Sequence, residues 1–206
     1  MWKPVLLLML LCWAAGAWAG PAPTILVMGD SLSAAYGIET SQGWAALLSQ
    51  RLAARGYDYT VINASVSGDT SAQGLTRLPF ELQRHRPAIV ILELGANDGL
   101  RGLSLAALRA NLGQMITLSQ QAGARVLLVG IYLPPNYGPD YTRKFAAVYP
   151  RLARDYHLPL VPFLLAGVAE HRDWMQPDGL HPLAMAESRV LDNVWIKLEP
   201  MLQRNR

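Results

Sequence analysis

Short apolar runs alternate with longer amphipathic segments along most of the chain. The apolar runs are rich in β-branched residues and predict strands at residues 24–28, 59–62, 88–94, 125–130 and 159–162. The amphipathic segments predict helices at residues 44–55, 71–85, 104–121, 141–157 and 182–202. Strands that alternate with helices in this way predict an α/β fold built on a mostly parallel sheet.

Two of these runs, 88–94 and 125–130, are almost continuously apolar. Continuous apolar strands are typical of a sheet that helices cover on both faces. We therefore predict a three-layer α/β/α sandwich around a mostly parallel five-stranded sheet. In such folds the carboxyl ends of the strands meet at one edge, where functional loops gather. Pro79 lies inside the second helix and is expected to kink or divide it.

The N-terminal segment contains the parts of an export signal in their usual order. Lys3 precedes the apolar run 5–18, and the run ends in the pattern AWA, which fits a small-residue cleavage site. The run is shorter than the about 18–20 residues that span a membrane. We predict a signal peptide at 1–19, a periplasmic or secreted domain at 20–206, and no membrane span after cleavage. The alternative is an uncleaved anchor. The only cysteine, Cys12, would leave with the signal, so no disulfide is expected.

Several classes of function are disfavoured by what the sequence lacks. A net charge of +3 with no extended basic run does not favour nucleic acid as a partner. One cysteine, and histidines outside any metal-ligand spacing, give no support for a metal site. Glycine-rich nucleotide motifs are missing, and so is the G-x-S-x-G elbow of α/β-hydrolases.

Polar residues follow the first three predicted strands. Ser31 lies in GDSLS, where we expect the chain to enter a helix whose N–H groups stabilise an alkoxide. Gly68 lies in NASVSGDT and offers a bare backbone N–H. Asn97 lies in GANDG and offers a side-chain amide. Each has an ordinary alternative, respectively a helix cap, a turn glycine and an Asn-Asp-Gly turn.

A fourth motif, DGLHP, precedes the last predicted helix, which we expect Pro182 to start. Asp178 and His181 are close enough in sequence to share a hydrogen bond when the glycine lets the chain fold between them. The histidine can then act as a general base while the aspartate holds its tautomer. The alternative is a surface loop with a capping aspartate.

Together, the four motifs resemble the blocks of the SGNH (GDSL) hydrolase superfamily and occur in the same order. The segments 63–70, 74–79, 93–102 and 133–138 are similar to its secreted bacterial thioesterase I / protease I / lysophospholipase L1 and arylesterase branch. The resemblance covers essentially the whole predicted mature chain and implies a flavodoxin-like fold. Ala35 and Ala96 depart from it, since glycine is frequent at both positions.

The resemblance also implies roles. Ser31 would be the nucleophile, His181 the general base and acid, and Asp178 the residue that orients it. The oxyanion hole would be the backbone N–H groups of Ser31 and Gly68 with the Asn97 side chain. For the acyl chain, Leu100, Leu133 and Tyr137 are candidate groove walls, although plain surface packing explains them equally well.

The implied reaction is hydrolysis of carboxylic esters and thioesters through an acyl-serine. Acyl esters, aryl esters and lysophospholipids are the expected small-molecule or lipid substrates. We expect no cofactor and no metal, and a monomer is the default for one domain. One alternative is a carbohydrate or acetyl-specific deacetylase of the same superfamily. Another is a non-enzymatic flavodoxin-like binding module.

Overall fold

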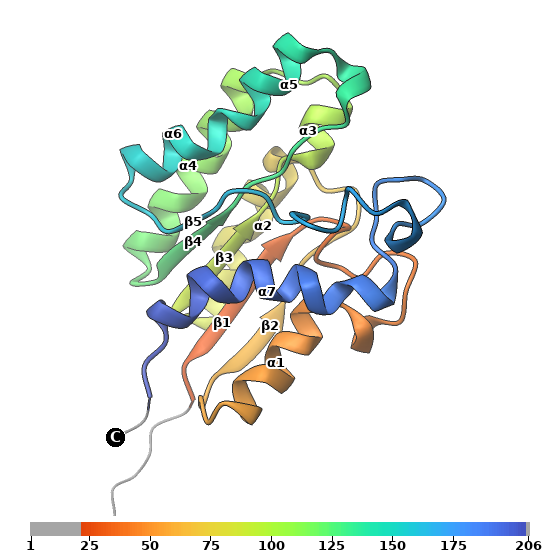
Figure 1. The fold of residues 1–206 in the computed structure, drawn as a ribbon. Helices are drawn as coiled ribbons and strands as arrows, with labels where there is room; N and C mark the ends of the chain where they lie inside the picture. Colours follow the sequence, from red (N-terminus) through yellow and green to blue (C-terminus); the bar gives the residue numbers. More distant parts are fainter. Residues whose placement is uncertain (1–21, 205–206) are drawn as a thin grey trace, which may run out of the picture.

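A five-stranded sheet forms the centre of the chain in the computed structural model, which describes residues 22–204 (Figure 1). The strands are β1 (Thr24–Gly29), β2 (Thr60–Asn63), β3 (Ile89–Glu93), β4 (Arg125–Val129) and β5 (Leu160–Val161). They lie in the order β2-β1-β3-β4-β5, and all four neighbouring pairs are parallel. The predicted parallel sheet is confirmed. The predicted signal at 1–19 lies outside the described residues.

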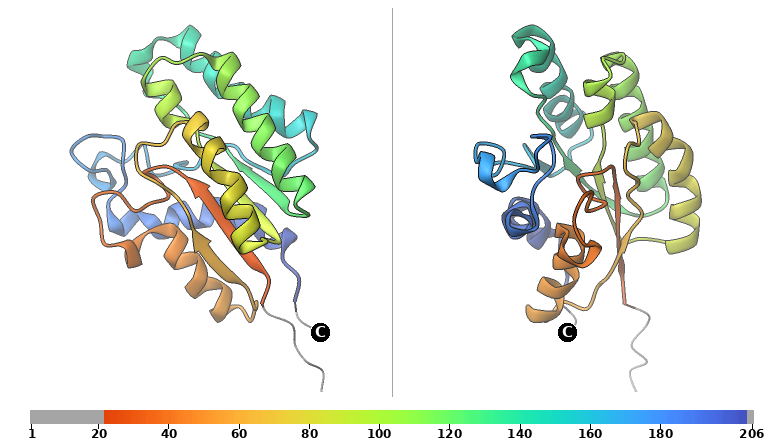
Figure 2. Two further views of the ribbon diagram at one scale, coloured as in Figure 1. Left: turned by 180° about the vertical axis from the view of Figure 1, so that it is seen from behind. Right: turned by 90° about the vertical axis from the view of Figure 1, so that its right-hand side faces the viewer.

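Helices cover both faces of this sheet. The α-helices are α1 (Trp44–Ala54), α2 (Ser71–His85), α3 (Ala96–Leu100), α4 (Leu105–Gln121), α5 (Pro139–Ala146), α6 (Val148–Asp155) and α7 (Glu187–Leu198). Short 3-10 helices lie at Thr40–Gln42, Pro135–Tyr137, Arg172–Trp174, Ala184–Ala186 and Glu199–Met201. Seen along its edge, the sheet has α1 and α7 on one side and α2 and α4 on the other, with α6 packed on α4 (Figure 2). This is the predicted three-layer sandwich.

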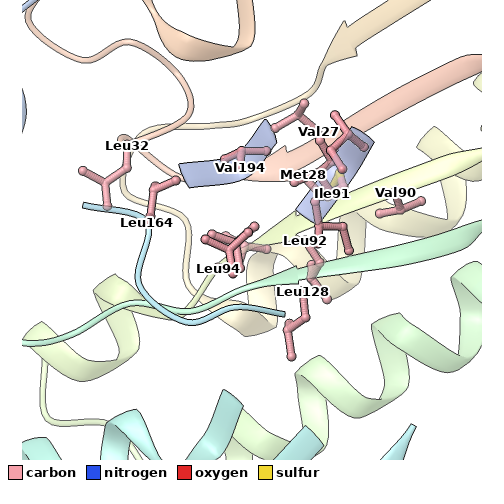
Figure 3. Packing of buried hydrophobic residues seen from close by; sticks show 14 of the residues in the cluster. Val27, Met28, Leu32, Val90, Ile91, Leu92, Leu94, Leu128, Leu164 and Val194 are labelled. Atoms are coloured by element: carbon pink, nitrogen blue, oxygen red, sulfur yellow. The ribbon is translucent and has the colours of Figure 1, made fainter. Parts of the chain in front are cut away.

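The core lies between these layers. Every residue of β3 is buried, as expected for a strand covered on both faces. Val27 of β1, Ile91 of β3 and Val194 of α7 belong to one cluster (Figure 3). Each fully buried side chain of this size contributes about 1.5–3 kcal/mol relative to an exposed one. The cluster therefore holds the strand ends, and the loops that follow them, in fixed positions. Among residues 22–204, no helix is both long and apolar enough to cross a membrane.

Side-chain caps fix where two of the helices start. The Thr70 hydroxyl accepts from the Gln73 N–H, and the Gln73 side chain accepts in return from the Thr70 N–H at 2.9 Å, which is a capping box. The Ser104 hydroxyl accepts from the Ala107 N–H at 3.3 Å and starts α4. The first cap fixes the residue at which α2 leaves the loop after β2, so the position of that loop is defined.

Three helix predictions need correction. The segment 141–157 forms two helices, α5 and α6, because Pro150 has no N–H to continue the hydrogen-bond ladder of α5. Pro182 does not start the last helix, since it pairs with Met175 in an antiparallel bridge, and α7 begins only at Glu187. Of the two outcomes expected at Pro79, a kink or a division, the division does not occur, because α2 runs through this residue.

Candidate active site

The segment after β1 carries Ser31 to the carboxyl edge of the sheet. The prediction that Ser31 enters a helix is wrong, because residues 31–37 form a series of turns. Ala35 is in the left-handed region, with φ of 60°, and a right-handed helix cannot continue through such a residue. The turns are closed by backbone bonds from Ala34 N–H to the Asp30 carbonyl at 2.9 Å and from Tyr36 N–H to the Ser31 carbonyl at 3.2 Å. The segment of Ser31 therefore supplies no helix dipole of its own.

Ser31, His181 and Asp178 form one hydrogen-bonded series at this edge. The Oγ atom of Ser31 lies 2.8 Å from Nε2 of His181, and Nδ1 of the same ring lies 2.6 Å from Oδ2 of Asp178. When Nδ1 donates to the carboxylate, Nε2 presents its lone pair to the serine hydroxyl. The imidazole is then placed to accept the hydroxyl proton.

Asp178 is held as a carboxylate. Its Oδ1 atom accepts from the backbone N–H groups of Leu180 at 2.9 Å and His181 at 3.1 Å. Partial burial acts to raise the pKa of Asp178, but these bonds and the His181 ring outweigh it and lower that pKa below 3.8. A carboxylate in this position stabilises the imidazolium that forms when His181 takes up a proton.

The loop after β2 is tied to α3 by Asn97. Its Nδ2 atom donates to the Asp69 carbonyl at 3.0 Å and lies 3.4 Å from a carboxylate oxygen of Asp30. Gly68, which precedes Asp69, has φ of +87°. Two of the three predicted oxyanion-hole residues, Gly68 and Asn97, therefore belong to one linked structure.

Two arginines that the sequence reasoning missed hold this loop. The Arg101 guanidinium donates to the Gly68 carbonyl at 2.8 Å. Arg77 donates to the Asp69 carboxylate at 2.6 and 2.9 Å and to the Ala64 carbonyl at 2.9 Å. Neither arginine stands out in the sequence, because Arg101 is 33 residues from Gly68 and Arg77 is eight residues from Asp69, inside α2.

Two buried carboxyl groups lie beneath the Ser31 turn. The Ser33 hydroxyl donates to Oε2 of Glu93 at 2.6 Å, and both Glu93 and Asp30 are fully buried. Burial, with the Asp30 charge adding to it, raises the pKa of Glu93 well above 4.5 and so favours its neutral form. Burial raises the pKa of Asp30 to about 7, against the lowering effect of a bond from the Leu32 N–H. Gly29 lets these groups approach, because a Cβ there would lie 2.7 Å from the Glu93 carboxyl.

A cavity of about 170 Å³ opens beside Ser31. Most of its wall is apolar, and the lining residues are Ser31, Leu32, Ala96, Asn97, Leu100, Ile131, Tyr132, Leu133, Pro134, Leu165, Leu180 and His181. Of the three candidate groove residues, Leu100 and Leu133 line this cavity. Tyr137 lies outside the lining and donates its hydroxyl to the Leu100 carbonyl at 3.1 Å. Gly68 and Asp178 also lie outside the lining.

A parallel α/β sandwich with serine, histidine and aspartate in one hydrogen-bonded series at its carboxyl edge defines a serine hydrolase. Within that class, sequence comparison places the chain more narrowly. It belongs to the GDSL-like lipase/acylhydrolase family, which it matches over residues 27–185.

Individual relatives agree with this membership. The chain is 55% identical over 181 residues to the esterase TesA of Pseudomonas aeruginosa, and the match covers 88% of this chain and 90% of the relative. It is 42% identical over 202 residues to thioesterase 1/protease 1/lysophospholipase L1 of Escherichia coli K12, covering 98% and 94%. A crystal structure of TesA superimposes with a TM-score of 0.85 at 55% identity, covering 87% of this chain and 99% of that one.

Proposed function

We propose that this chain hydrolyses carboxylic esters and thioesters through an acyl-serine intermediate on Ser31. The observation that carries the proposal is the hydrogen-bonded series from Ser31 through His181 to Asp178, beside an apolar cavity. A free serine hydroxyl is a weak nucleophile, and a histidine at 2.8 Å is in reach of its proton. Asp178 keeps the histidine in the tautomer that can accept it.

In the first half of the reaction, the Ser31 proton moves to Nε2 of His181 while Oγ bonds to the substrate carbonyl carbon. The carbonyl oxygen becomes an oxyanion, to which the backbone N–H groups of Ser31 and Gly68 and the side-chain amide of Asn97 would donate. A donor of this kind typically contributes about 2.7–4 kcal/mol to the transition state. The bond to the leaving alkoxide or thiolate then breaks, and His181 gives that group its proton.

In the second half, water takes the place of the leaving group. His181 removes a proton from the water, whose oxygen bonds to the acyl carbon. The bond to Ser31 breaks, the serine regains its proton from His181, and the carboxylic acid leaves. The cycle returns every residue to its starting state.

The cavity favours an acyl chain as the group beside Ser31. Its wall is built from leucine, isoleucine and proline side chains together with Tyr132, and such a surface binds a hydrocarbon better than a sugar hydroxyl. This lining disfavours the alternative of a carbohydrate deacetylase. The Escherichia coli relative is a thioesterase and lysophospholipase by name, which adds thioesters and lysophospholipids to the proposed substrates of this chain.

An activity panel tests the proposal. Nitrophenyl esters from acetyl to palmitoyl, an acyl thioester and a lysophospholipid would be offered to the mature chain and to its Ser31→Ala variant. We expect only the wild type to hydrolyse esters whose acyl chains are longer than acetyl. The wild type and Ser31→Ala should have equal melting temperatures. Equal turnover by both proteins, or none by either, would contradict the proposal, and turnover of acetyl esters alone would favour the deacetylase.

We also propose that the chain is exported and that residues 1–19 are removed, leaving a monomer. The proposal is supported by the order of Lys3, the apolar run and the AWA pattern in the sequence. The test is to express the full chain in a bacterium, fractionate the cells and sequence the N-terminus. A periplasmic or secreted chain that begins at Gly20 is expected. A membrane-bound chain that keeps Met1 would show an anchor instead, and light scattering of the mature chain would test for a monomer.

A further inference from the structure

We propose that Gln176 is a positioning residue that sets the distance between Ser31 and His181. It does so by joining the segment after β1, which carries Ser31, to the segment before α7, which carries His181. The proposal rests on the proposed function, because it assigns Gln176 to the same reaction. Gln176 does not line the cavity beside Ser31, so it would act through other residues.

The side chain of Gln176 bonds to both segments at once. Its Nε2 atom donates to the Tyr36 carbonyl at 2.7 Å and to the Pro182 carbonyl at 3.0 Å. Tyr36 belongs to the turns that begin at Ser31, and Pro182 directly follows His181. One amide group therefore links the two segments, its bond to Tyr36 spans 140 residues of the sequence, and both of its N–H bonds are used.

The backbone of Gln176 makes the His181 segment rigid. Its N–H donates to the His181 carbonyl at 2.8 Å, and its own carbonyl accepts from the Gly179 N–H at 2.9 Å. The bridge between Met175 and Pro182 closes the same loop. Because Gln176 belongs to this closed loop, its side-chain bond to Tyr36 holds the whole loop, and His181 with it, against the Ser31 turns.

The Ser31 segment is shaped to receive this amide. Gly37 has φ of +76°, and a Cβ there would lie 2.2 Å from Oε1 of Gln176, so only glycine leaves room. The neighbouring Tyr36 ring packs on the His181 ring with centroids 4.6 Å apart. The backbone and the ring of the same tyrosine thus contact the two ends of the loop.

The chemistry of the contact requires an amide. Only a group with two N–H donors can satisfy two carbonyl oxygens, and a methionine or a glutamate of similar size cannot. Loss of these bonds would free the loop to move away from Ser31 and lengthen the 2.8 Å contact on which proton transfer depends. Small displacements of this kind can lower rates by about 100-fold.

The test compares Gln176→Met, Gln176→Glu and Gly37→Ala with wild type. Gln114→Ala, an exposed glutamine on α4, is the control and should behave as wild type. The kcat and KM for a nitrophenyl ester are measured per active site, titrated with a nitrophenyl phosphonate. We expect kcat to fall about 10- to 100-fold in all three variants with KM little changed. Gln176→Glu should be the slowest, because its carboxylate faces two carbonyl oxygens.

Wild-type kcat per titrated site in the Gln176 variants would overturn the proposal. So would a loss confined to melting temperature or to the active fraction, which a packing role alone predicts. If the Gln176 variants do not fold, Gly37→Ala tests the same contact with the glutamine in place, and wild-type kcat there overturns the proposal equally. Failure of the proposed function would look different, since wild type and Ser31→Ala would then have equal turnover.

Discussion

One oxygen of the Asp178 carboxylate contacts the His181 ring, and the other oxygen has separate partners. Oδ2 lies 2.6 Å from Nδ1 of His181, while Oδ1 accepts two backbone N–H groups of the same loop. The contact to the ring is therefore fixed by the loop itself. The carboxylate orients the His181 ring toward Ser31, and its negative charge lies beside that ring.

Replacing Asp178 with asparagine removes that charge and lets an NH₂ group face Nδ1. The ring would then favour the tautomer whose Nε2 carries the proton, which cannot accept another from Ser31. We expect kcat to fall by about 10²- to 10⁴-fold with little change in melting temperature. The nearby exposed Asp173 offers the control Asp173→Asn, which should retain activity. An Asp178→Asn variant as active as this control would exclude the orienting role.

Glu93 is predicted to be a neutral acid that accepts a hydrogen bond from the Ser33 hydroxyl. Glu93→Gln preserves a neutral acceptor, so kcat/KM should stay within a few-fold of wild type. Glu93→Ala leaves the buried hydroxyl unpaired and should lower the free energy of unfolding by about 1–3 kcal/mol. Urea denaturation and ester kinetics on both variants check this. If glutamine proves as damaging as alanine, the ionised carboxylate is the form that the fold needs.

Glu187 makes a prediction about stability and pH. Burial raises its pKa to about 7, against the lowering effect of a 2.8 Å bond from the Trp44 N–H. The unfolded chain releases this proton near pH 4.5 and the folded chain near pH 7, so the folded state binds more protons in between. Stability attributable to this group should therefore fall as pH rises from 4.5 to 7.

Glu187→Gln keeps the acceptor and removes the ionisation. The variant should match wild type near pH 4 and exceed it by up to about 3 kcal/mol at pH 8. Urea denaturation at several pH values measures the difference. If the free energies of unfolding of the variant and wild type differed by the same amount at every pH, Glu187 would ionise in the folded chain as it does in the unfolded one.

Ala35 provides a test of backbone strain at the Ser31 turns. Its φ of 60° is costly for a residue with a Cβ and free for glycine. Ala35→Gly should therefore raise the free energy of unfolding by about 0.5–1 kcal/mol. The exposed Ala53 in α1 is the matched site. Ala53→Gly should lower the free energy of unfolding by about the same amount. If both substitutions change the free energy of unfolding in the same direction, backbone strain at Ala35 is excluded.

Local pattern was enough to predict most of the sheet. Apart from Glu93 and Arg125, the strands β3 and β4 consist of apolar residues, as expected where helices cover both faces, and that property is visible in the sequence. The motifs at Ser31, Asn97 and His181 were also visible, since each directly follows a strand or precedes the last helix. These motifs predicted which residues the structure now brings together.

The remaining features depend on contacts between distant segments. Nothing in the local sequence shows that Ile131 and Leu165 line the cavity, or that Arg101 bonds to the loop at Gly68. The turns after Ser31 look like the start of a helix, but the left-handed Ala35 excludes one. Apolar periodicity likewise ran through the boundary of α5 and α6, because the missing N–H of Pro150 does not alter it.

The proposed mechanism requires Ser31 to carry the acyl group. Mixing the protein with excess nitrophenyl ester, quenching in acid within milliseconds and mapping the peptides by mass spectrometry tests it directly. We expect an acyl mass on the peptide that contains Ser31, and we expect it to disappear in Ser31→Ala. An acyl mass on another residue, or hydrolysis by Ser31→Ala at the wild-type rate, would contradict it.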